Sequence, residues 1–271
     1  MKKTIITLIA FCSAASAASV GYNGMSDTQK KDVAFAWDFS NGDNGFAVGS
    51  VDMGGRGWGS DDFSLTDDGT AIVGSQGTCP WSCQVAGMGN SFTLSLDVNS
   101  IEAYGNWASI VSLYSNGGNA TFNHAMSLTT NGAGDGTLIL QSGLGGETPY
   151  GNAGNQTLST GLTASQVEDV TFTIVSDAVA KTLTLYVNGT QTSQVTNWVA
   201  GNGETLALTG FQFGSNFSEK DVIGKAEISN ITVWNKALSS TEVSALIVPE
   251  PTTATLSLLA LAGLAARRRR K

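Results

Sequence analysis

The chain has 271 residues, of which 33 are glycine and only 13% are charged, and its 22 acidic and 14 basic side chains give a formal net charge of −8. A protein that binds nucleic acid needs a clustered positive surface, so this composition excludes nucleic acid as a partner. The hydrophobic content of 41% allows a core to form, and the length between the two ends suits one large β domain of ~200–250 residues as well as two small domains.

Residues 1–17 have the three parts of a secretory signal peptide. Lys2 and Lys3 form a basic head, residues 5–11 form a short apolar run, and residues 15–17, Ala-Ser-Ala, are the small residues expected at a cleavage site. We therefore expect export through the Sec translocon and removal of residues 1–17 by signal peptidase. A short buried helix would explain neither the lysines nor the small residues.

Export decides how the cysteines are interpreted. Cys12 leaves with the signal peptide, so the mature chain keeps only Cys79 and Cys83. In an oxidising compartment, two cysteines this close in the sequence are expected to form a local disulfide bond. A redox motif of the Cys-x-x-Cys type is the alternative, but the spacing here is one residue longer.

Apolar and polar residues alternate with a period of two through the middle of the chain. In residues 92–98 the apolar side chains share one face and the polar ones share the other, which predicts a strand that covers a core on one side only. The same alternation predicts further strands in residues 110–114, 170–175, 183–187 and 228–234.

Turn signals separate the expected strands. Asn131-Gly132, Asp135-Gly136 and Asn188-Gly189 are dipeptides that adopt positive φ at low cost. The first two predict one hairpin, in which residues 126–130 pair with residues 137–140.

Helix signals are almost absent. The best of them is Ser239, followed three residues later by Glu242, which predicts one short C-terminal helix that begins with a capping box. Many short strands, glycine-rich turns and few helices predict an all-β fold, either a sandwich or a barrel.

Two stretches resemble the C-terminal half of laminin-G-like, concanavalin A-like domains. They are residues 182–190, Thr-Leu-Thr-Leu-Tyr-Val-Asn-Gly-Thr, and residues 226–246, which contain Asn-Lys-Ala-Leu-Ser before the expected helix. The resemblance implies a jelly roll, a sandwich of two antiparallel β-sheets, over residues 18–247, opening with a strand at residues 34–39. It also implies glycan or protein ligands at loops or on a concave face, in some members with calcium. Residues 167–169 lack a tryptophan that members usually carry there, so no ligand residue is transferred from the family.

Residues 248–271 resemble the PEP-CTERM sorting signal of Gram-negative bacteria. Pro249-Glu250-Pro251 is followed by an uncharged stretch, residues 252–266, and then by four arginines and a lysine. The resemblance implies processing by a membrane exosortase and delivery to the cell envelope, the outer surface or the extracellular matrix. The uncharged stretch is shorter than the ~20 residues that span a bilayer, and the basic end stays in the cytoplasm, which predicts transient insertion into the inner membrane. A permanent single-span anchor is the alternative.

The sequence offers little catalytic chemistry. Glucanases of the same superfamily use a Glu-x-Asp-x-x-Glu strand, whose outer carboxylates act as nucleophile and acid. The nearest match begins with Glu219 and Asp221, but Gly224 replaces the acid. The single histidine, His124, falls beside apolar residues of an alternating run, and with two cysteines it provides too few ligands for zinc. We therefore expect a protein without enzymatic activity.

Calcium is the one cofactor that the sequence allows, because it needs only oxygen ligands. Six aspartates lie in glycine-rich sequence, where backbone carbonyls could assist: Asp38, Asp43, Asp61, Asp62, Asp67 and Asp68. Of these, Asp38 and Asp43 are the candidate ligands. Aspartate beside glycine is also typical of plain turns.

Sugar binding needs exposed aromatic faces beside hydrogen-bonding groups. Five aromatic residues lie in or beside sequence rich in glycine and asparagine and are therefore candidates: Trp58, Trp81, Trp107, Tyr150 and Trp198. Trp37 and Trp234 lie in expected strands and are assigned to the core. The sequence thus predicts an exported binding protein that recognises a polysaccharide, a glycoprotein or another matrix component. The alternatives are a structural matrix protein without a discrete ligand and a divergent glycoside hydrolase.

Overall fold

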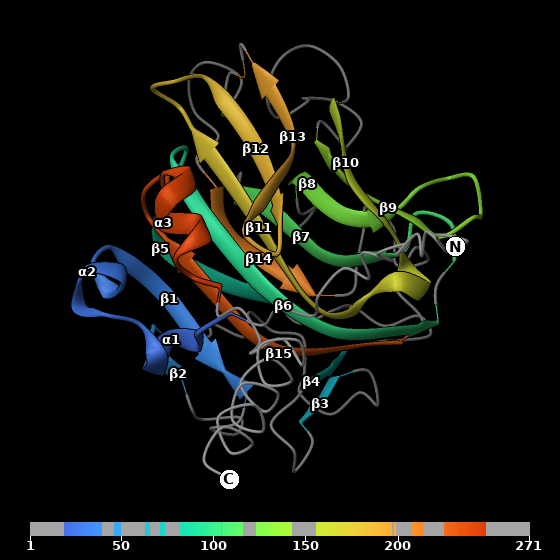
Figure 1. The fold of residues 1–271 in the computed structure, drawn as a ribbon, viewed down its shortest axis with the longest axis horizontal. Helices are drawn as coiled ribbons and strands as arrows, with labels where there is room; N and C mark the ends of the chain where they lie inside the picture. The colour runs from blue at the N-terminus through green and yellow to red at the C-terminus, as the bar shows by residue number, and fades with distance from the viewer. Residues whose placement is uncertain are drawn as a thin grey trace, which may run out of the picture.

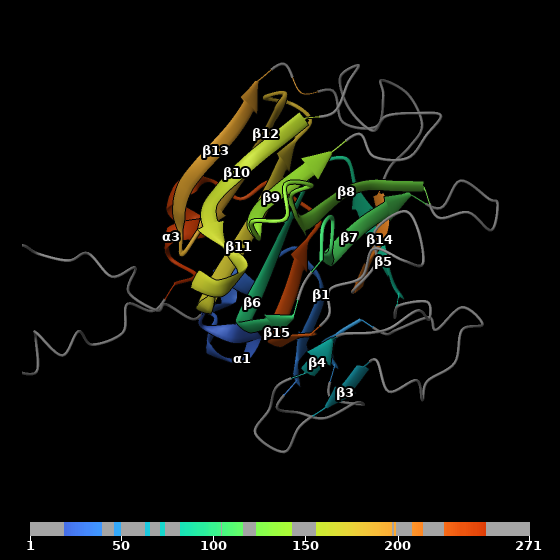
Figure 2. The same cartoon turned by 90° about the vertical axis from the view of Figure 1, so that its right-hand side faces the viewer.

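Two antiparallel β-sheets face each other across a hydrophobic core in the computed structural model of the chain (Figure 1, Figure 2). All structural statements below concern the residues that the structure describes, which are 19–39, 46–49, 63–65, 71–73, 82–103, 105–115, 123–142, 156–196, 198, 208–213 and 225–247.

The larger sheet has nine strands. They are β1 (Val33–Asp38), β2 (Phe46–Val48), β3 (Phe63–Leu65), β4 (Ala71–Val73), β6 (Phe92–Ala103), β11 (Glu168–Asp177), β12 (Thr182–Val187), β13 (Thr190–Thr196) and β15 (Lys225–Trp234). The main path through the sheet runs in the order β13-β12-β11-β6-β15-β1-β2, while β4 pairs with β15 and β3 pairs with β4. The long strands β6 and β15 therefore lie at its centre.

The smaller sheet has six strands in the order β10-β9-β8-β7-β14-β5. They are β5 (Ser82–Gly89), β7 (Ser109–Ser115), β8 (Asn123–Thr130), β9 (Thr137–Ser142), β10 (Gln156–Thr163) and β14 (Leu208–Phe213). Between consecutive described strands the chain crosses from one sheet to the other six times, namely from β4 to β5, β5 to β6, β6 to β7, β10 to β11, β13 to β14 and β14 to β15. Neither sheet is therefore formed by one continuous part of the chain.

The predicted fold class, an all-β sandwich of two antiparallel sheets with one short C-terminal helix, is confirmed. Each expected strand lies within a strand of the structure, and the opening strand predicted at residues 34–39 corresponds to β1. The expected hairpin is formed by β8 and β9, in which Leu128 pairs with Leu140. Asn188 and Gly189 join β12 to β13 with φ values of 49° and 71°, as their sequence predicts.

The two sheets are joined by a cluster of aromatic rings. Phe35 of β1 and Phe211 of β14 meet edge to face with ring centroids 5.3 Å apart. Phe39 and Phe213 continue the contact between the layers at 6.3 Å. Trp37, which packs on Phe39 at 4.2 Å, is buried in this core as expected. Edge-to-face pairs add stabilisation beyond the area that they bury.

The second face of the nine-stranded sheet is also covered, contrary to the sequence prediction. Thr93, Ser95 and Asp97 point away from the inter-sheet core, yet all three are buried. Residues 19–32 and 235–247 lie over this face, on the side away from the smaller sheet (Figure 2). The prediction that β6 covers a core on one side only is wrong because alternation shows that two faces differ in polarity, not that one of them meets water.

Three short helices build this outer layer. They are α1 (Gly21–Gly24), α2 (Asp27–Lys30) and α3 (Ser240–Ser244). Only α3 was predicted. The helical layer has its own apolar cluster, formed by Met25, Val175, Tyr186, Trp234, Leu238, Val243 and Leu246. Trp234 is therefore buried as expected, although on the outer face rather than between the sheets.

The predicted capping box starts α3. The Ser239 hydroxyl accepts a hydrogen bond from the Glu242 backbone N–H at 3.3 Å, and Glu242 Oε2 accepts from the Ser239 backbone N–H at 2.7 Å. Lys236 Nζ lies 3.0 Å from Glu242 Oε1. The Ser239 N–H first, and then Lys236, lower the pKa of Glu242 to about 2.

Replacing Phe211 with alanine tests the aromatic junction. Because Phe211 is fully buried between the sheets, we expect Phe211→Ala to lower the free energy of unfolding by about 3–5 kcal/mol, measured by chemical denaturation. Val179, which is 91% exposed, provides the control, since Val179→Ala is expected to change stability by less than about 0.5 kcal/mol. Equal stability of the two variants would contradict this assignment.

The depressed pKa of Glu242 predicts a pH-dependent contribution to stability. A lowered pKa means that the carboxylate stabilises the fold above its ordinary value of 4.5 and loses this effect as the pH falls through about 2. We expect Glu242→Gln to lower the melting temperature at pH 7 by the equivalent of about 1 kcal/mol or less, because Glu242 is partly exposed. The melting temperatures of the two proteins should converge near pH 2. A difference that does not change between pH 7 and pH 2 would refute the assignment.

Candidate functional site

A row of uncharged polar residues crosses the smaller sheet. Cross-strand register aligns Thr157 of β10 with Gln141 of β9, Gln141 with Ser127 of β8, and Ser127 with Ser112 of β7. The register continues to Gln212 of β14 and Ser82 of β5. We call the four positions from Thr157 to Ser112 the polar row.

The polar row faces away from the inter-sheet core. On β8, Met126 and Leu128 belong to the core on either side of Ser127. On β9, Leu140 belongs to the core beside Gln141. Because successive side chains of a strand point to opposite faces, Ser127 and Gln141 lie on the outer face of the smaller sheet.

Three serine hydroxyls form a network at the centre of the polar row. Ser127 Oγ lies 2.7 Å from Ser109 Oγ and 2.9 Å from Ser112 Oγ. Since Ser127 also donates to the Val111 carbonyl at 3.3 Å, it accepts from the other two hydroxyls. All three serines are buried, and their hydroxyls satisfy one another's hydrogen bonding.

Gln141 is the member of the row whose hydrogen bonding is incomplete. Its side chain is only 6% exposed, and its Oε1 atom has no hydrogen-bond partner. A buried acceptor without a partner costs about 1–3 kcal/mol. The Gln141 carbonyl oxygen is therefore an enclosed acceptor whose hydrogen-bonding capacity is not used.

Trp107 forms an exposed aromatic surface at the end of β7. It precedes the strand by two residues, has a left-handed φ of 59° and is 38% exposed. Its indole ring packs against Gly132 of the β8–β9 turn, where an added Cβ atom would lie 2.6 Å from the ring. Only glycine allows this close approach, so the turn and the ring are matched to each other.

Hydrogen bonds from Thr130 hold the loop that carries Trp107. Thr130 Oγ1 accepts from the Ala108 backbone N–H at 2.9 Å and donates to the Gly105 carbonyl at 2.6 Å. The Thr130 N–H donates to the Ala108 carbonyl at 3.0 Å. The buried Thr130 side chain therefore holds the backbone on both sides of Trp107, at Gly105 and at Ala108, without a ligand.

The same turn carries a carboxylate. Asp135 Oδ1 accepts from the Thr137 backbone N–H at 2.9 Å, and this hydrogen bond is the main reason why the pKa of Asp135 lies below its ordinary value. Asp135 is exposed and is ionised at neutral pH. It adds a hydrogen-bond acceptor on the turn against which Trp107 packs.

The two sequence-predicted ligand residues that the structure describes differ in exposure to solvent. Trp107 is exposed, as its proposed role requires. Trp198 is fully buried, and its Nε1–H donates to Ser176 Oγ at 3.2 Å, so the prediction that it stacks on a ligand is wrong. The other three aromatic candidates, Trp58, Trp81 and Tyr150, lie outside the described residues.

The structure describes only some of the residues predicted as metal ligands, disulfide partners or catalytic groups. Asp38 lies in β1, and no group of three His, Cys, Asp or Glu residues within the described part of the chain could hold a metal ion. Calcium at Asp38 and Asp43 thus stays a prediction. Cys83 lies in β5 and His124 in β8, but nothing is described of their side chains. Asp43, Cys79, Glu219, Asp221 and residues 249–251 lie outside the described residues.

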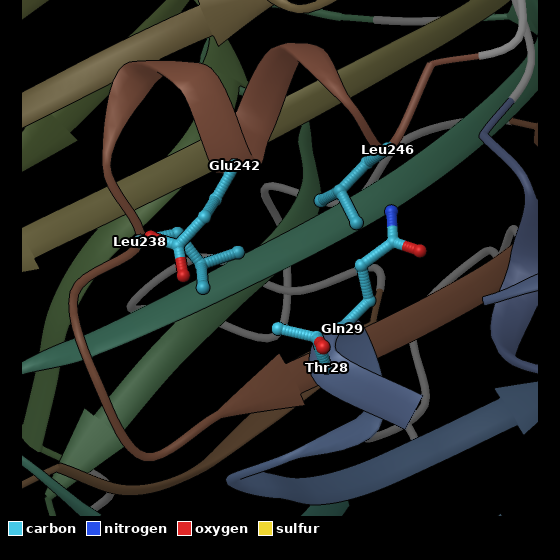
Figure 3. Close-up of a pocket in the computed structure, with 5 residues that line it drawn as sticks. All are labelled: Thr28, Gln29, Leu238, Glu242 and Leu246. Carbon is cyan, nitrogen blue, oxygen red and sulfur yellow. The ribbon is translucent and has the colours of Figure 1, made fainter. Parts of the chain in front are cut away.

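A small pocket lies between α2 and α3 (Figure 3). It is lined by Thr28, Gln29, Leu238, Glu242 and Leu246. Its polar groups already have protein partners, since Gln29 Nε2 donates to the Ala245 carbonyl at 2.9 Å and Glu242 caps α3. The pocket is therefore part of the contact between the two helices rather than a ligand site.

One domain family and one sorting motif match the chain. The Concanavalin A-like lectin/glucanases superfamily matches residues 73–244, and the PEP-CTERM protein-sorting motif matches residues 248–271. No curated protein matches the chain. No helix in the described part of the chain is both long enough and apolar enough to cross a membrane.

Several solved structures share the fold at low sequence identity. Domain 4 of AbnA, a GH43 extracellular arabinanase from Geobacillus stearothermophilus in complex with arabinotriose, has a TM-score of 0.53 and 16% identity, over 79% of this chain and 98% of that one. The binding domain of botulinum neurotoxin DC in complex with SialylT has a TM-score of 0.53 and 12% identity, over 80% and 51%. Trypanosoma rangeli sialidase in complex with sialic acid has a TM-score of 0.52 and 16% identity, over 79% and 32%. These likenesses support the sandwich fold.

The contact between Trp107 and Gly132 can be tested without a ligand. We expect Gly132→Ala to displace the Trp107 ring while changing the free energy of unfolding by less than about 1 kcal/mol, because an exposed side chain can move. Fluorine NMR of the protein labelled with fluorotryptophan provides the measurement, and Trp107→Phe identifies the resonance. An unchanged Trp107 resonance in Gly132→Ala would contradict the packing described here.

Proposed function

Because the chain belongs to the Concanavalin A-like lectin/glucanases superfamily and carries a PEP-CTERM protein-sorting motif, we propose that it is an exported surface protein that binds a neutral glycan. The exposed ring of Trp107 forms the binding surface. The protein binds its ligand without transforming it.

Trp107 is the observation that carries this proposal. An exposed tryptophan ring offers an apolar face that can stack on the apolar face of a pyranose. Its ring is held by Gly132 and its loop by Thr130 before any ligand arrives, so little conformational entropy is lost on binding. A tryptophan with no ligand to bind would gain more by burying its ring, as Trp198 and Trp234 do.

The polar row agrees with a neutral ligand. Its side chains are hydroxyls and amides, which carry no charge. Ser112, Ser127 and Gln141 are buried, so the row bears on the charge of this side of the sheet and not on direct contact with a ligand. An anionic ligand would call for arginine or lysine, and neither occurs at any position of the row.

A purely binding role agrees with the chemistry of the site. Retaining hydrolysis of a glycosidic bond requires two carboxylates about 5–5.5 Å apart. The polar row contains no carboxylate, and no described base pairs with its serine network. The arabinanase domain that matches over 98% of its length was solved with a bound arabinotriose, which supports oligosaccharide binding by this architecture.

Export completes the proposal. We infer that residues 1–17 direct the chain to the Sec translocon, that signal peptidase removes them, and that an exosortase acts on the C-terminal motif after transient insertion into the inner membrane. In the oxidising compartment beyond, Cys79 and Cys83 form a local disulfide bond. Calcium at Asp38 and Asp43 is an accessory prediction that the glycan site does not require.

A glycan array tests the binding proposal. Residues 18–271, purified in detergent, should bind a subset of neutral oligosaccharides in a saturable manner. Trp107→Ala should weaken binding at least about tenfold, whereas Val179→Ser, at an exposed apolar residue far from the polar row in sequence, should not change it. Absence of any selective binding would favour a structural matrix protein, and release of reducing sugar that Glu219→Gln abolishes would indicate a hydrolase.

The uncharged row also predicts how salt affects binding. Interactions between charges weaken as ionic strength rises, whereas stacking and neutral hydrogen bonds do not. We expect the dissociation constant to change less than about twofold between 50 and 500 mM sodium chloride, measured by titration calorimetry. A tenfold loss of affinity over this range would show that charged groups dominate the site.

A further inference from the structure

Asp97 is a carboxylate buried at the centre of the nine-stranded sheet. It lies on β6, faces the outer layer and is only 4% exposed. Its Oδ1 atom accepts from Thr171 Oγ1 at 2.6 Å and from the Ser19 backbone N–H at 3.4 Å. Its Oδ2 atom accepts from Ser19 Oγ at 2.6 Å and from Asn230 Nδ2 at 3.0 Å. The four donors satisfy a carboxylate but do not neutralise its charge.

The described groups around Asp97 provide no compensating cation. Alternation places Asp38 of β1, Asp169 of β11 and Glu227 of β15 on the same face, and all three are acidic. In the outer layer, Lys236 pairs with Glu242 and with Asp32, and Lys30 lies over the Tyr22 ring. The other charged groups of that layer, Asp27 and Lys31, are exposed.

Burial without a cation leaves Asp97 poorly stabilised. Desolvation raises the pKa of its carboxyl, and the hydrogen bonds from Ser19, Thr171 and Asn230 offset this only in part. A buried charge of this kind is normally paired.

A cation becomes available when the signal peptide is removed. Signal peptidase hydrolyses the Ala17–Ala18 bond: water adds across the bond, Ala17 leaves with a carboxylate, and the new amine of Ala18 takes up a proton. Covalent bond lengths keep this nitrogen within about 3.7 Å of the Ser19 nitrogen, and so within about 7 Å of Asp97 Oδ1.

We propose that Asp97 is the docking site for the mature N-terminus, and that the α-ammonium group of Ala18 pairs with it once residues 1–17 are removed. This proposal rests on the export inferred above. Asn230 Oδ1, a buried atom without a hydrogen-bond partner, lies beside Gly21 and provides a second acceptor. The uncleaved chain has an amide at this place, which carries no charge.

The docked N-terminus also holds the C-terminal end of the domain. Ser19 forms a β-bridge with Ile247, and the Val20 N–H donates to the Leu246 carbonyl at 2.8 Å. Ile247 directly precedes the PEP-CTERM motif at residue 248. Removal of the signal peptide therefore strengthens the part of the fold from which the sorting motif leaves.

The test compares forms of residues 18–271 that differ only at the N-terminus: a free α-amine, an acetylated α-amine, and a Gly-Ser extension that moves the amine away from Asp97. We expect the free form to melt about 4 °C higher than the other two at pH 7. NMR should find the α-amine pKa raised by about one unit above its ordinary 7.7–8.0. A raised pKa means that the advantage is complete below pH 7.7 and disappears as the pH rises through the new value.

Asp97→Asn provides the matched control, because the difference between the free and acetylated forms should then vanish. If Asp97→Asn does not fold, the α-amine titration of the unmutated chain decides alone. An ordinary α-amine pKa, or equal melting temperatures of the three forms, would overturn the proposal.

These measurements do not depend on glycan binding, so the binding proposal can fail separately. N-terminal sequencing of the exported protein should find Ala18 first. A different first residue would overturn the docking of Ala18 and would leave the glycan site untouched.

Discussion

The outer face of the nine-stranded sheet is polar and nevertheless buried, and this combination constrains both ends of the domain. Ser95 and Thr173 share a hydrogen bond across β6 and β11, at 3.2 Å between hydroxyl oxygens. Thr93 donates to the Lys236 carbonyl and accepts from the Leu238 N–H, both at 2.9 Å. Buried hydroxyls need such partners, so the segments that supply them must dock in one position. Apolar contacts alone would leave the position of the outer layer less well determined.

Eight of the fifteen described strands were predicted from the sequence, because their signal is local. Alternation within five to seven residues located β6, β7, β11, β12 and β15, two dipeptides located the β8–β9 hairpin, and the resemblance to a known family located β1. The outer layer was not predictable by the same method. Thr93, Ser95 and Asp97 have the composition of a solvent-facing row, and only contacts with Ser19 and residues 236–238, far away in the sequence, bury them. Periodicity reports the difference between two faces but not what covers each of them.

The candidate site shows the same division. Trp107 could be identified because a tryptophan in glycine-rich sequence has few apolar neighbours in the chain. Trp198 has a similar local sequence but is buried, since its partner Ser176 belongs to β11 and is known only from the fold. The polar row has no linear signature, because Gln141, Ser127 and Ser112 become neighbours only through strand register. Their positions opposite the apolar residues of each strand were the one available signal.

The two sheets place the ends of the domain and the polar row on opposite sides of the core. The bridge between Ser19 and Ile247 lies at the outer face of the nine-stranded sheet, where Ser19 contacts Asp97. The polar row lies on the outer face of the other sheet, on the far side of the aromatic core. If the segment after Ile247 anchors the chain as proposed, the anchor holds the domain by the side opposite the polar row. In the proposed function, processing of the C-terminal motif would then change where the domain acts without remodelling the surface around Trp107.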